Sequence, residues 1–381
     1  IISASRHVFI RTAASFRQGA RTLPRAYYTS EEVLAAEKDA IFGSLWSWVG
    51  RSSRLAQAGD YIVVAVADES IIVVRGRDGI VRAFFNVCRH RGTRLCTTET
   101  GRWGDVIQCP YHAWTYAIEG DLIGAPHMHG VDGFSREDYP LHTAAVAESN
   151  GFVFVNVATA TTPFATWIAP LATRLDRFNL ETLRIAHHVT YDVRANWKLV
   201  FQNYSECLHC PVIHPELADR IPYQSSANDL ADGPFLGGYM ELAADHESVT
   251  ATGKRCAPPI APTMKDDQRR AYYYSAMPNL LLSIHPDYVN YYRLTPLGVD
   301  RTRVDSEWLF NFDPANPRTA RPEEAVSFWD LVNRQDWHIV EQGQQGIASR
   351  RYEPGPYSPR ESLCAAWDRE YLRLMQGYQR V

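Results

Sequence analysis

Residues 203–214 read Asn-Tyr-Ser-Glu-Cys-Leu-His-Cys-Pro-Val-Ile-His, and this stretch is the most informative part of the 381-residue sequence. It places a carboxylate at Glu206 and imidazoles at His209 and His214. In a helix, Glu206 and His209 share one face, because residues three apart are neighbours there. Pro211 cannot continue a regular helix and restricts the residue before it. The chain should therefore bend near Pro211, which can bring His214 back towards His209.

Two neutral imidazoles and one carboxylate form the donor set of a facial iron(II) site, which leaves coordination positions open for oxygen and substrate. The candidate ligands in this stretch are His209 and His214. A His-x4-His pair also occurs among ordinary polar residues, so the pattern gains its weight from a second set upstream.

The second set consists of two short pairs that each join a Cys to a His. One residue separates Cys88 from His90, eighteen residues follow, and two residues then separate Cys109 from His112. Two thiolates and two imidazoles are the ligands of a [2Fe–2S] centre in which histidines replace two cysteines on one iron. The alternative is a closed tetrahedral zinc site. Zinc ligands usually pair Cys with Cys and His with His, so the pattern favours the iron–sulfur cluster.

Together the two sets resemble the large (alpha) subunit of Rieske non-haem iron oxygenases, over roughly residues 25–375. The resemblance rests on residues 88–92 (Cys-Arg-His-Arg-Gly), residues 109–114 (Cys-Pro-Tyr-His-Ala-Trp) and the spacing Glu-x2-His-x4-His after residue 205. The carboxylate before the first iron histidine is most often Asp in ring-hydroxylating dioxygenases. It is Glu206 here, as in the branch that resembles choline, carnitine and glycine-betaine monooxygenases.

A facial triad needs an acid besides the two histidines, and the helix predicted over residues 323–349 offers Asp330 and Asp336. Asp336 shares a face with Val332 and Val340. An acid in an apolar stripe is costly to bury unless it is paired or metal-bound. Asp330 lies on a polar face instead, so periodicity selects Asp336, and the family's last ligand lies in a similar late helix. The alternative for Asp336 is a buried carboxylate satisfied by a nearby Arg.

The pattern of β runs and helical segments predicts an α+β fold with two domains. Residues 1–41 are expected to form an N-terminal arm and a helix that pack on the fold. Residues 42–162 are expected to form a small antiparallel β domain of the Rieske [2Fe–2S] type, with the ligands on loops at strand ends. Residues 163–170 read as a linker. Residues 171–381 are expected to form a catalytic domain with an antiparallel sheet covered by helices.

Two segments of the predicted catalytic domain bear directly on the site. Residues 197–206 are expected to form a helix that delivers the iron ligands. Residues 215–270 are rich in Pro, Asp and Gly, and this composition favours an irregular lid over the pocket.

Composition limits the classes of partner and compartment. A net charge of −4 gives no indication of a nucleic-acid partner, and no apolar run reaches the length of a membrane span. Seven cysteines do not form a disulfide scaffold in a chain this long, and Cys207 and Cys210 read as packing residues. This usage fits a reducing cytoplasm. Before Glu31 the sequence is rich in Arg and Ser and lacks acids, which also resembles an organellar transit peptide. An N-terminal arm is preferred, because residues 22–28 look like folded sequence.

The resemblance implies specific roles for the candidate residues. The residues that map onto the family's cluster and iron ligands are Cys88, His90, Cys109, His112, His209, His214 and Asp336. Glu206 maps onto a carboxylate that contacts a cluster histidine, here His112, across a subunit boundary. Because electrons then run from one subunit's cluster to the next subunit's iron, the resemblance implies a head-to-tail homotrimer. A separate flavin and iron–sulfur reductase drawing on NAD(P)H is also implied, and this chain carries no Gly-x-Gly-x-x-Gly fingerprint.

The branch implies that the chain uses O2 to hydroxylate an N-methyl group of a quaternary ammonium compound, with release of formaldehyde. One alternative is a ring-hydroxylating dioxygenase of an aromatic acid, which would need an Arg or Lys over a flat apolar slot. Another is an iron–sulfur electron carrier, which would leave the downstream ligand set idle. Aromatic faces bind permanent cations. Two or three tyrosines of one set, or a Trp, are therefore expected to line the pocket. The set consists of Tyr204, Tyr239, Tyr272, Tyr273, Tyr274, Tyr288, Tyr291 and Tyr292.

Overall fold

The computed structural model describes residues 8–159, 161–261, 264–312 and 319–378, which fall into two compact units. One unit is Ile41–Ile168, and the other joins the chain before Ile41 to the chain from Ala169 onward. Each unit is built on antiparallel sheets, so the predicted α+β class is confirmed. No helix among the described residues is both long enough and apolar enough to cross a lipid bilayer.

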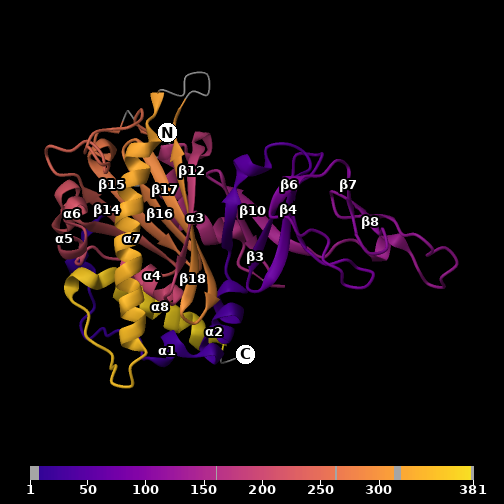
Figure 1. The fold of residues 1–381 in the computed structure, drawn as a ribbon, viewed down its shortest axis with the longest axis horizontal. Helices are drawn as coiled ribbons and strands as arrows, with labels where there is room; N and C mark the ends of the chain where they lie inside the picture. The colour runs from indigo at the N-terminus through magenta and orange to yellow at the C-terminus, as the bar shows by residue number, and fades with distance from the viewer. Residues whose placement is uncertain (1–7, 160, 262–263, 313–318, 379–381) are drawn as a thin grey trace. The chain divides into compact units, whose positions relative to one another are not determined.

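The smaller unit contains a seven-stranded sheet in the order β2-β11-β10-β5-β4-β3-β6 and a three-stranded sheet in the order β7-β8-β9. Figure 1 labels β3, β4, β6, β7, β8 and β10 of this unit. Its central strand β4 buries residues 71–74, Ile-Ile-Val-Val, because β-branched side chains pack well on a pleated surface. The strands are β2 (Ser47–Arg51), β3 (Asp60–Val66), β4 (Glu69–Arg75), β5 (Val81–Phe85), β6 (Thr100–Arg102), β7 (Val106–Gln108), β8 (Thr115–Ala117), β9 (Leu122–Gly124), β10 (Thr143–Ser149) and β11 (Phe152–Asn156).

The larger unit contains one eight-stranded antiparallel sheet in the order β1-β13-β14-β15-β16-β17-β18-β12. Every residue of the central strand β16 is buried, which explains its continuous apolar run Leu-Leu-Leu before Ser283. The strands are β1 (Ile10–Arg11), β12 (Arg184–Val193), β13 (Ala227–Leu230), β14 (Phe235–Glu241), β15 (Arg270–Ala276), β16 (Leu280–Ile284), β17 (Tyr288–Gly298) and β18 (Arg301–Phe310).

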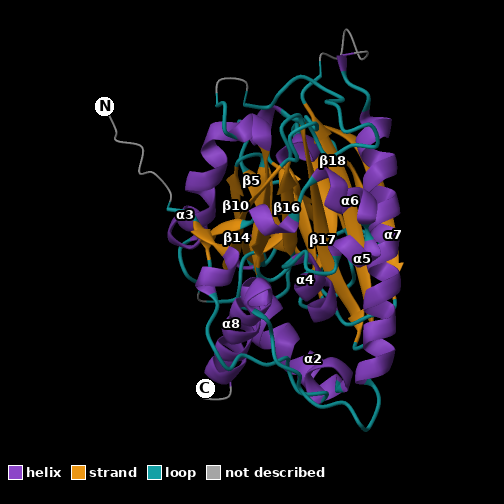
Figure 2. Cartoon of the chain, turned by 90° about the vertical axis from the view of Figure 1, so that its left-hand side faces the viewer, coloured by secondary structure: helices purple, strands orange, loops and turns teal. Residues whose placement is uncertain are grey.

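Helices cover this sheet, and the longest of them, α7, lies alongside β12 and β18 (Figures 1 and 2). The shorter α4 contacts α7 and β17. The helices are α1 (Ala26–Thr29), α2 (Glu31–Glu37), α3 (Phe164–Leu175), α4 (Trp197–Tyr204), α5 (Cys210–Ile213), α6 (Pro215–Arg220), α7 (Pro322–Ile347) and α8 (Ser362–Tyr378).

A buried ion pair fixes the start of α4. Nζ of Lys198 lies 2.5 Å from Oε1 of Glu37, which comes from α2, and neither side chain is exposed to solvent. The indole of Trp197 and the hydroxyl of Tyr371 also donate to this carboxylate. A buried charge is tolerated only with such complete pairing, so the network ties α2, α4 and α8 together beneath the site.

Two of the predicted segments differ in local structure. Residues 163–170 contain the boundary between the two units, at Ile168 and Ala169, but they are helical, because α3 begins at Phe164 and continues past Pro170. Its apolar residues Trp167, Ile168 and Leu171 are buried and outweigh the proline signals. Residues 215–270 are not an irregular lid throughout, since they contain α6, β13 and β14.

Candidate metal centres

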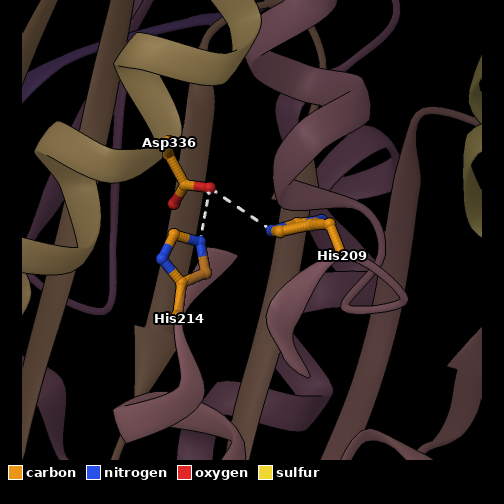
Figure 3. A group of neighbouring side chains, drawn as sticks. All are labelled: His209, His214 and Asp336. Atoms are coloured by element: carbon orange, nitrogen blue, oxygen red, sulfur yellow. Dashed lines mark hydrogen bonds and ion pairs between the residues drawn. The ribbon is translucent and has the colours of Figure 1, made fainter. Parts of the chain in front are cut away.

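His209, His214 and Asp336 converge on one point in the larger unit (Figure 3). Oδ1 of Asp336 lies 2.9 Å from Nε2 of His214 and 3.3 Å from Nε2 of His209. The three ligand atoms lie within 4.8 Å of one another. This is the open two-histidine, one-carboxylate arrangement that suits iron(II), so the donor set fits the metal that the sequence implies.

Local structure differs from the predicted single helix with a bend at Pro211. The helix α4 ends at Tyr204, so Glu206 and His209 lie in the turn that follows it. Pro211 is in the first turn of α5, where a missing N–H does no harm, and it begins a helix rather than ending one. The chain turns again at His214, whose φ and ψ of −130° and 65° are not helical. Two turns therefore bring the imidazoles together.

Each ligand is oriented by a hydrogen bond from a neighbour. Nδ1 of His209 lies 2.5 Å from Oε1 of Glu206, and Nδ1 of His214 lies 2.7 Å from Oε1 of Gln335. Because both oxygens accept, each imidazole donates from Nδ1 and directs Nε2 towards Asp336, which is the nitrogen that a bound metal would take.

The carboxylate is held in the same way, since Asn203 donates its Nδ2 to Oδ1 of Asp336 at 2.9 Å. Sequence reasoning did not identify Asn203 or Gln335. Their positions in the sequence could have indicated both residues, because Asn203 lies three residues before Glu206 and Gln335 is adjacent to Asp336.

The carboxylates also set the charge of the imidazoles in the metal-free chain. Burial lowers the pKa of His209, but hydrogen bonds to Asp336 and Glu206 outweigh burial and raise the pKa to about 10. Burial likewise lowers the pKa of His214, and the Asp336 hydrogen bond more than reverses this. Burial raises the pKa of Asp336, yet the two histidines hold it below its usual value. The site therefore favours positive charge opposite its carboxylate, as a metal ion would supply.

Asp330, the rejected alternative, has different partners. Its carboxylate accepts hydrogen bonds from Arg334 at 2.8 Å and from the hydroxyl of Tyr191 at 2.7 Å. Asp336 shows no arginine partner among the described residues, so the alternative of an arginine-satisfied carboxylate is not supported.

In the smaller unit, two loops with the same backbone pattern carry the Cys and His pairs. Cys88 follows β5 by three residues, and Cys109 directly follows β7. The carbonyl of Cys88 accepts the N–H of Gly92, and the carbonyl of Cys109 accepts the N–H of Ala113. Gly92 and Ala113 have positive φ values of 74° and 54°, which turn each loop back on itself. The sequence therefore builds two equivalent loops that each present one thiol and one imidazole.

The four side chains pair by chemical type rather than by loop: the two imidazoles are neighbours, and so are the two thiols. The rings of His90 and His112 lie 4.8 Å apart between centroids. Burial raises the pKa of the Cys88 thiol, and the neighbouring Cys109 thiol adds to the rise. Thiols beside thiols and imidazoles beside imidazoles fit a cluster in which one iron takes each pair.

A single zinc ion does not fit these loops. Tetrahedral zinc would bring its ligand atoms to about 3.3–3.8 Å from one another. Among the described residues, the triad of Asp336, His209 and His214 is the only set of three or more acid, Cys or His side chains whose ligand atoms converge within 4.8 Å. The Cys and His loops therefore do not close on one point, whereas a two-iron cluster keeps its thiolate and imidazole ligands apart.

The imidazole of His90 has the properties of a cluster ligand. Its Nδ1 is buried and has no hydrogen-bond partner. Burial lowers its pKa, and the charges of His112 and Arg91 lower it further, which keeps the ring neutral. The ring stacks on Trp114 at 4.9 Å. An orphaned, neutral and fixed imidazole nitrogen is suited to bind a metal.

A cavity lies beside the triad, within the larger unit. The volume of the cavity, taken as the space that the centres of water molecules can occupy, is about 120 Å³. Its aromatic lining consists of Tyr204, Tyr223, Tyr239, Tyr273, Tyr292, Trp329 and Trp337. The prediction that two or three tyrosines or a Trp line the pocket is confirmed, whereas Tyr272, Tyr274, Tyr288 and Tyr291 are buried in the core.

Cys207 and Cys210 also line this cavity, and the structure joins them in a disulfide. The prediction of two packing thiols is therefore wrong. The turn after α4 brings the two Cα atoms to 5.0 Å, which is within the range for a disulfide. The sequence analysis did not predict this turn, so it did not predict the disulfide.

Comparisons with known proteins agree with this geometry. Two family models match the chain: the Rieske [2Fe-2S] domain over residues 45–135, and the ring hydroxylating alpha subunit (catalytic domain) over residues 180–377.

Among curated relatives, the glycine betaine monooxygenase oxygenase subunit of Chromohalobacter salexigens is 31% identical, with 90% of this chain and 83% of the relative covered. The carnitine monooxygenase oxygenase subunit of Acinetobacter baumannii is 39% identical, with 87% and 86% covered.

A solved structure shows the same fold over most of both chains. It is a quaternary ammonium Rieske monooxygenase whose structure gives insight into carnitine oxidation by gut microbiota and inter-subunit electron transfer. It superposes with a TM-score of 0.80 at 27% identity and covers 93% of this chain and 95% of its own. The Cys and His loops lie within the matched Rieske domain, and the triad lies within the matched catalytic domain. This chain therefore belongs to the Rieske non-haem iron oxygenases, as an oxygenase alpha subunit.

Proposed function

We propose that this enzyme inserts one oxygen atom of O2 into a C–H bond of an N-methyl group on a quaternary ammonium compound. The hydroxylated methyl group is a carbinolamine, which releases formaldehyde and leaves the demethylated amine. The second oxygen atom leaves as water after reduction by two electrons. The observation that carries the proposal is the aromatic lining of the cavity beside the triad, because ring faces bind a permanent cation. The glycine betaine and carnitine monooxygenases support the same substrate class.

The ligand assignments belong to the same proposal. The proposed cluster ligands are Cys88, His90, Cys109 and His112, and the proposed ligands of the mononuclear iron(II) are His209, His214 and Asp336. When bound, the cluster supplies single electrons and the iron activates O2. In this assignment residues 42–162 form the Rieske domain and residues 171–381 form the catalytic domain. Residues 1–41 form an arm, in which β1 pairs with β13.

The residues around the triad have positioning roles in this proposal. Glu206 and Gln335 keep the two imidazoles in the tautomer that leaves Nε2 available. Asn203 holds the carboxylate of Asp336. The aromatic side chains of the cavity exclude water from the reacting methyl group and bind its cationic nitrogen.

We also propose that the chain assembles head to tail as a homotrimer and receives its electrons from a separate flavin and iron–sulfur reductase. The inter-subunit electron transfer of the related quaternary ammonium monooxygenase supports this arrangement. In the trimer, Glu206 would contact His112 of the partner subunit. Glu206 keeps 14% of its side chain exposed, and His112 is half-buried beside exposed Tyr111, so both have accessible edges. A cytoplasmic location stays a prediction.

Complementation tests the assembly. Chains that cannot hold the cluster (Cys88→Ser) and chains that cannot hold the iron (His209→Ala) should each be inactive alone. Because the electron route would cross a subunit boundary, mixing the two during assembly should restore part of the activity. A fully active monomer, or mixed assemblies without activity although both centres are loaded, would contradict the proposal.

The reaction itself is tested with holoenzyme, NADH and a surrogate reductase. Glycine betaine, L-carnitine and choline should be assayed for formaldehyde, O2 and NADH, with His209→Ala as the iron-free control. The proposal predicts matching amounts of formaldehyde released and NADH oxidised. If quaternary amines give only uncoupled O2 consumption and an aromatic carboxylate is hydroxylated, the ring-hydroxylating alternative is correct. Electron transfer without any product would identify an electron carrier.

A further inference from the structure

Part of the wall of the cavity is a row of residues across three strands. Gly238 on β14 lies directly opposite Asn228 on β13 and Tyr273 on β15, and all three residues line the cavity. Directly opposite residues of antiparallel strands project to the same face. Asn228 and Tyr273 are therefore about 10 Å apart along the sheet, two strand spacings, with no side chain between them.

The backbone prevents any side chain from filling this gap. A Cβ atom on Gly238 would lie 2.0 Å from the carbonyl oxygen of Ala227, far inside the contact distance. Only glycine fits here, so the recess between Asn228 and Tyr273 is a fixed part of the sheet.

Polar groups at this recess lack partners. Asn228 is 5% exposed, and its Nδ2 has no hydrogen-bond acceptor, although its Oδ1 accepts the hydroxyl of Thr12 at 3.4 Å. The hydroxyl of Tyr273 is buried without a partner as well. A buried donor without an acceptor is destabilising, so native proteins rarely leave one unless a ligand or an ordered water satisfies it.

A cationic side chain borders the same cavity. Arg360 lies in the short helical turn η10 (Pro359–Glu361), and its guanidinium is 5.7 Å from the ring centroid of Tyr223. Within the described residues it has no carboxylate partner and no hydrogen bond. The two acids that line the cavity are engaged elsewhere, since Glu206 is bonded to His209 and Asp336 belongs to the triad.

We propose that Asn228 and Arg360 form a subsite for a carboxylate, so that the substrate is a zwitterion with a quaternary ammonium group at one end and a carboxylate at the other. This inference rests on the proposed function and narrows its substrate class. A guanidinium and an amide N–H match the acceptors of a carboxylate, and the hydroxyl of Tyr273 adds a third donor. A substrate with only a positive charge would leave these donors unsatisfied and meet the like charge of Arg360.

The size of the cavity agrees with a small zwitterion. One water molecule needs about 10–15 Å³ of such space, so 120 Å³ accommodates on the order of ten non-hydrogen atoms. Both the triad and the recess border this one cavity, so a molecule of this size can contact residues of each.

The test compares acids with their primary amides, which keep size and the quaternary nitrogen but lose the negative charge. L-carnitine, glycine betaine and their amides should be assayed for formaldehyde release with wild-type holoenzyme, and their binding should be measured by calorimetry. We expect the acids to be preferred by on the order of 10- to 100-fold in kcat/KM. Arg360→Gln should abolish this preference by lowering kcat/KM and affinity for the acids, with a change of roughly threefold or less for the amides.

Three further variants separate recognition from folding. Arg360→Lys keeps the charge and should restore part of the preference. Asn228→Ala should lower affinity for the acids more than for the amides. Arg369→Gln, which changes an arginine that pairs with Asp232 outside the cavity, should behave as wild type.

Two outcomes would overturn the inference, and they are distinguishable. Equal use of acids and amides by the wild type, or an equal loss for both in Arg360→Gln, would remove the carboxylate subsite while leaving the demethylase reaction intact. Failure of every quaternary amine, acid or amide, to release formaldehyde would overturn the proposed function and this inference together.

Discussion

Nδ1 of His209 lies 2.5 Å from Oε1 of Glu206, so the two residues act as one unit. The other carboxylate oxygen accepts the backbone N–H groups of Leu208 and His209, which fixes the carboxylate on the turn it belongs to. Glu206 therefore orients a proposed iron ligand, His209, within its own chain and still has an exposed edge for a contact outside it.

Glu206→Gln tests this unit. The amide keeps the size of the side chain and can still accept a hydrogen bond, but it loses the charge. We expect iron affinity to fall roughly 10- to 100-fold, because partners of metal-bound histidines have effects of this size. With excess iron both centres should load, yet NADH-coupled turnover should still fall by a similar factor. Iron titration and coupled assays measure the two effects separately. The exposed Glu181→Gln is the control, and unchanged turnover in Glu206→Gln would refute the role.

Two aspartates on α7 provide a matched pair for the iron site. Asp336→Asn should lose the mononuclear iron and all turnover while keeping the cluster, because only Asp336 faces both histidines. Asp330→Asn should keep all of its iron, since Asp330 is bonded to Arg334 and Tyr191 instead. Iron analysis and the EPR signal of the reduced cluster distinguish the variants. Iron loss in Asp330→Asn, or iron retained in Asp336→Asn, would reverse the assignment.

Tyr116 should tune the proposed cluster. Its hydroxyl accepts the N–H of Arg89 at 3.0 Å and lies 3.3 Å from Sγ of Cys88. If Cys88 binds iron as a thiolate, its sulfur can only accept, so the hydroxyl would donate to it. A hydrogen bond to sulfur stabilises the more negative, reduced cluster. Tyr116→Phe should therefore lower the reduction potential, as measured by redox titration. Tyr111→Phe, whose side chain is exposed, should leave the potential unchanged. An unchanged potential in Tyr116→Phe would show that the hydroxyl does not act on the cluster.

Asp368 should make stability depend on pH. Burial raises its pKa to about 7, although Tyr357, Gln202 and Lys198 oppose this. The unfolded carboxyl has a pKa near 3.9, so the native state holds the proton more tightly. The tighter proton binding of Asp368 in the native state contributes to the free energy of unfolding. The contribution is complete below about pH 4 and is lost as the pH rises to 7.

Asp368→Asn removes that dependence. Relative to wild type, the free energy of unfolding of the variant should increase between pH 5 and pH 8, by up to about 2.5 kcal/mol on an order-of-magnitude basis. Denaturant unfolding at both pH values measures the difference. The exposed Asp245→Asn should follow the wild type at both values. A variant that loses stability relative to wild type as the pH rises would contradict the sign.

Two glycines should respond to alanine in opposite directions. Gly238→Ala places a Cβ against the backbone of β13 and should lower the melting temperature and the affinity for substrate. Gly343→Ala, in the interior of α7, meets no atom within 4 Å and should stabilise by about 0.5–1 kcal/mol. Thermal unfolding of the two variants measures both effects. A stable Gly238→Ala enzyme with wild-type affinity would show that the recess is not rigid.

The candidate ligands could be predicted from the sequence because each set lies in a short stretch whose residue types carry the chemistry, and the structure brings His209 and His214 together with Asp336. Asp336 was also readable, since helical periodicity placed it on the buried face of a long, regular helix. The recess at Gly238 could not be predicted in this way. It exists because Asn228 and Tyr273, which are 45 residues apart in sequence, both lie opposite Gly238 on neighbouring strands. Strand register of this kind comes from long-range packing, which local patterns do not encode.

The triad also draws on two distant parts of the chain. His214 and Asp336 are 122 residues apart, and the segment between them contains β13 to β18, six of the eight strands of the sheet. A bound iron would therefore link the two ends of this segment and stabilise its folded state, since both ends must be in place to bind the iron. Iron affinity would then depend on correct folding of the sheet. A destabilising substitution far from the metal could therefore be detected first as a loss of bound iron.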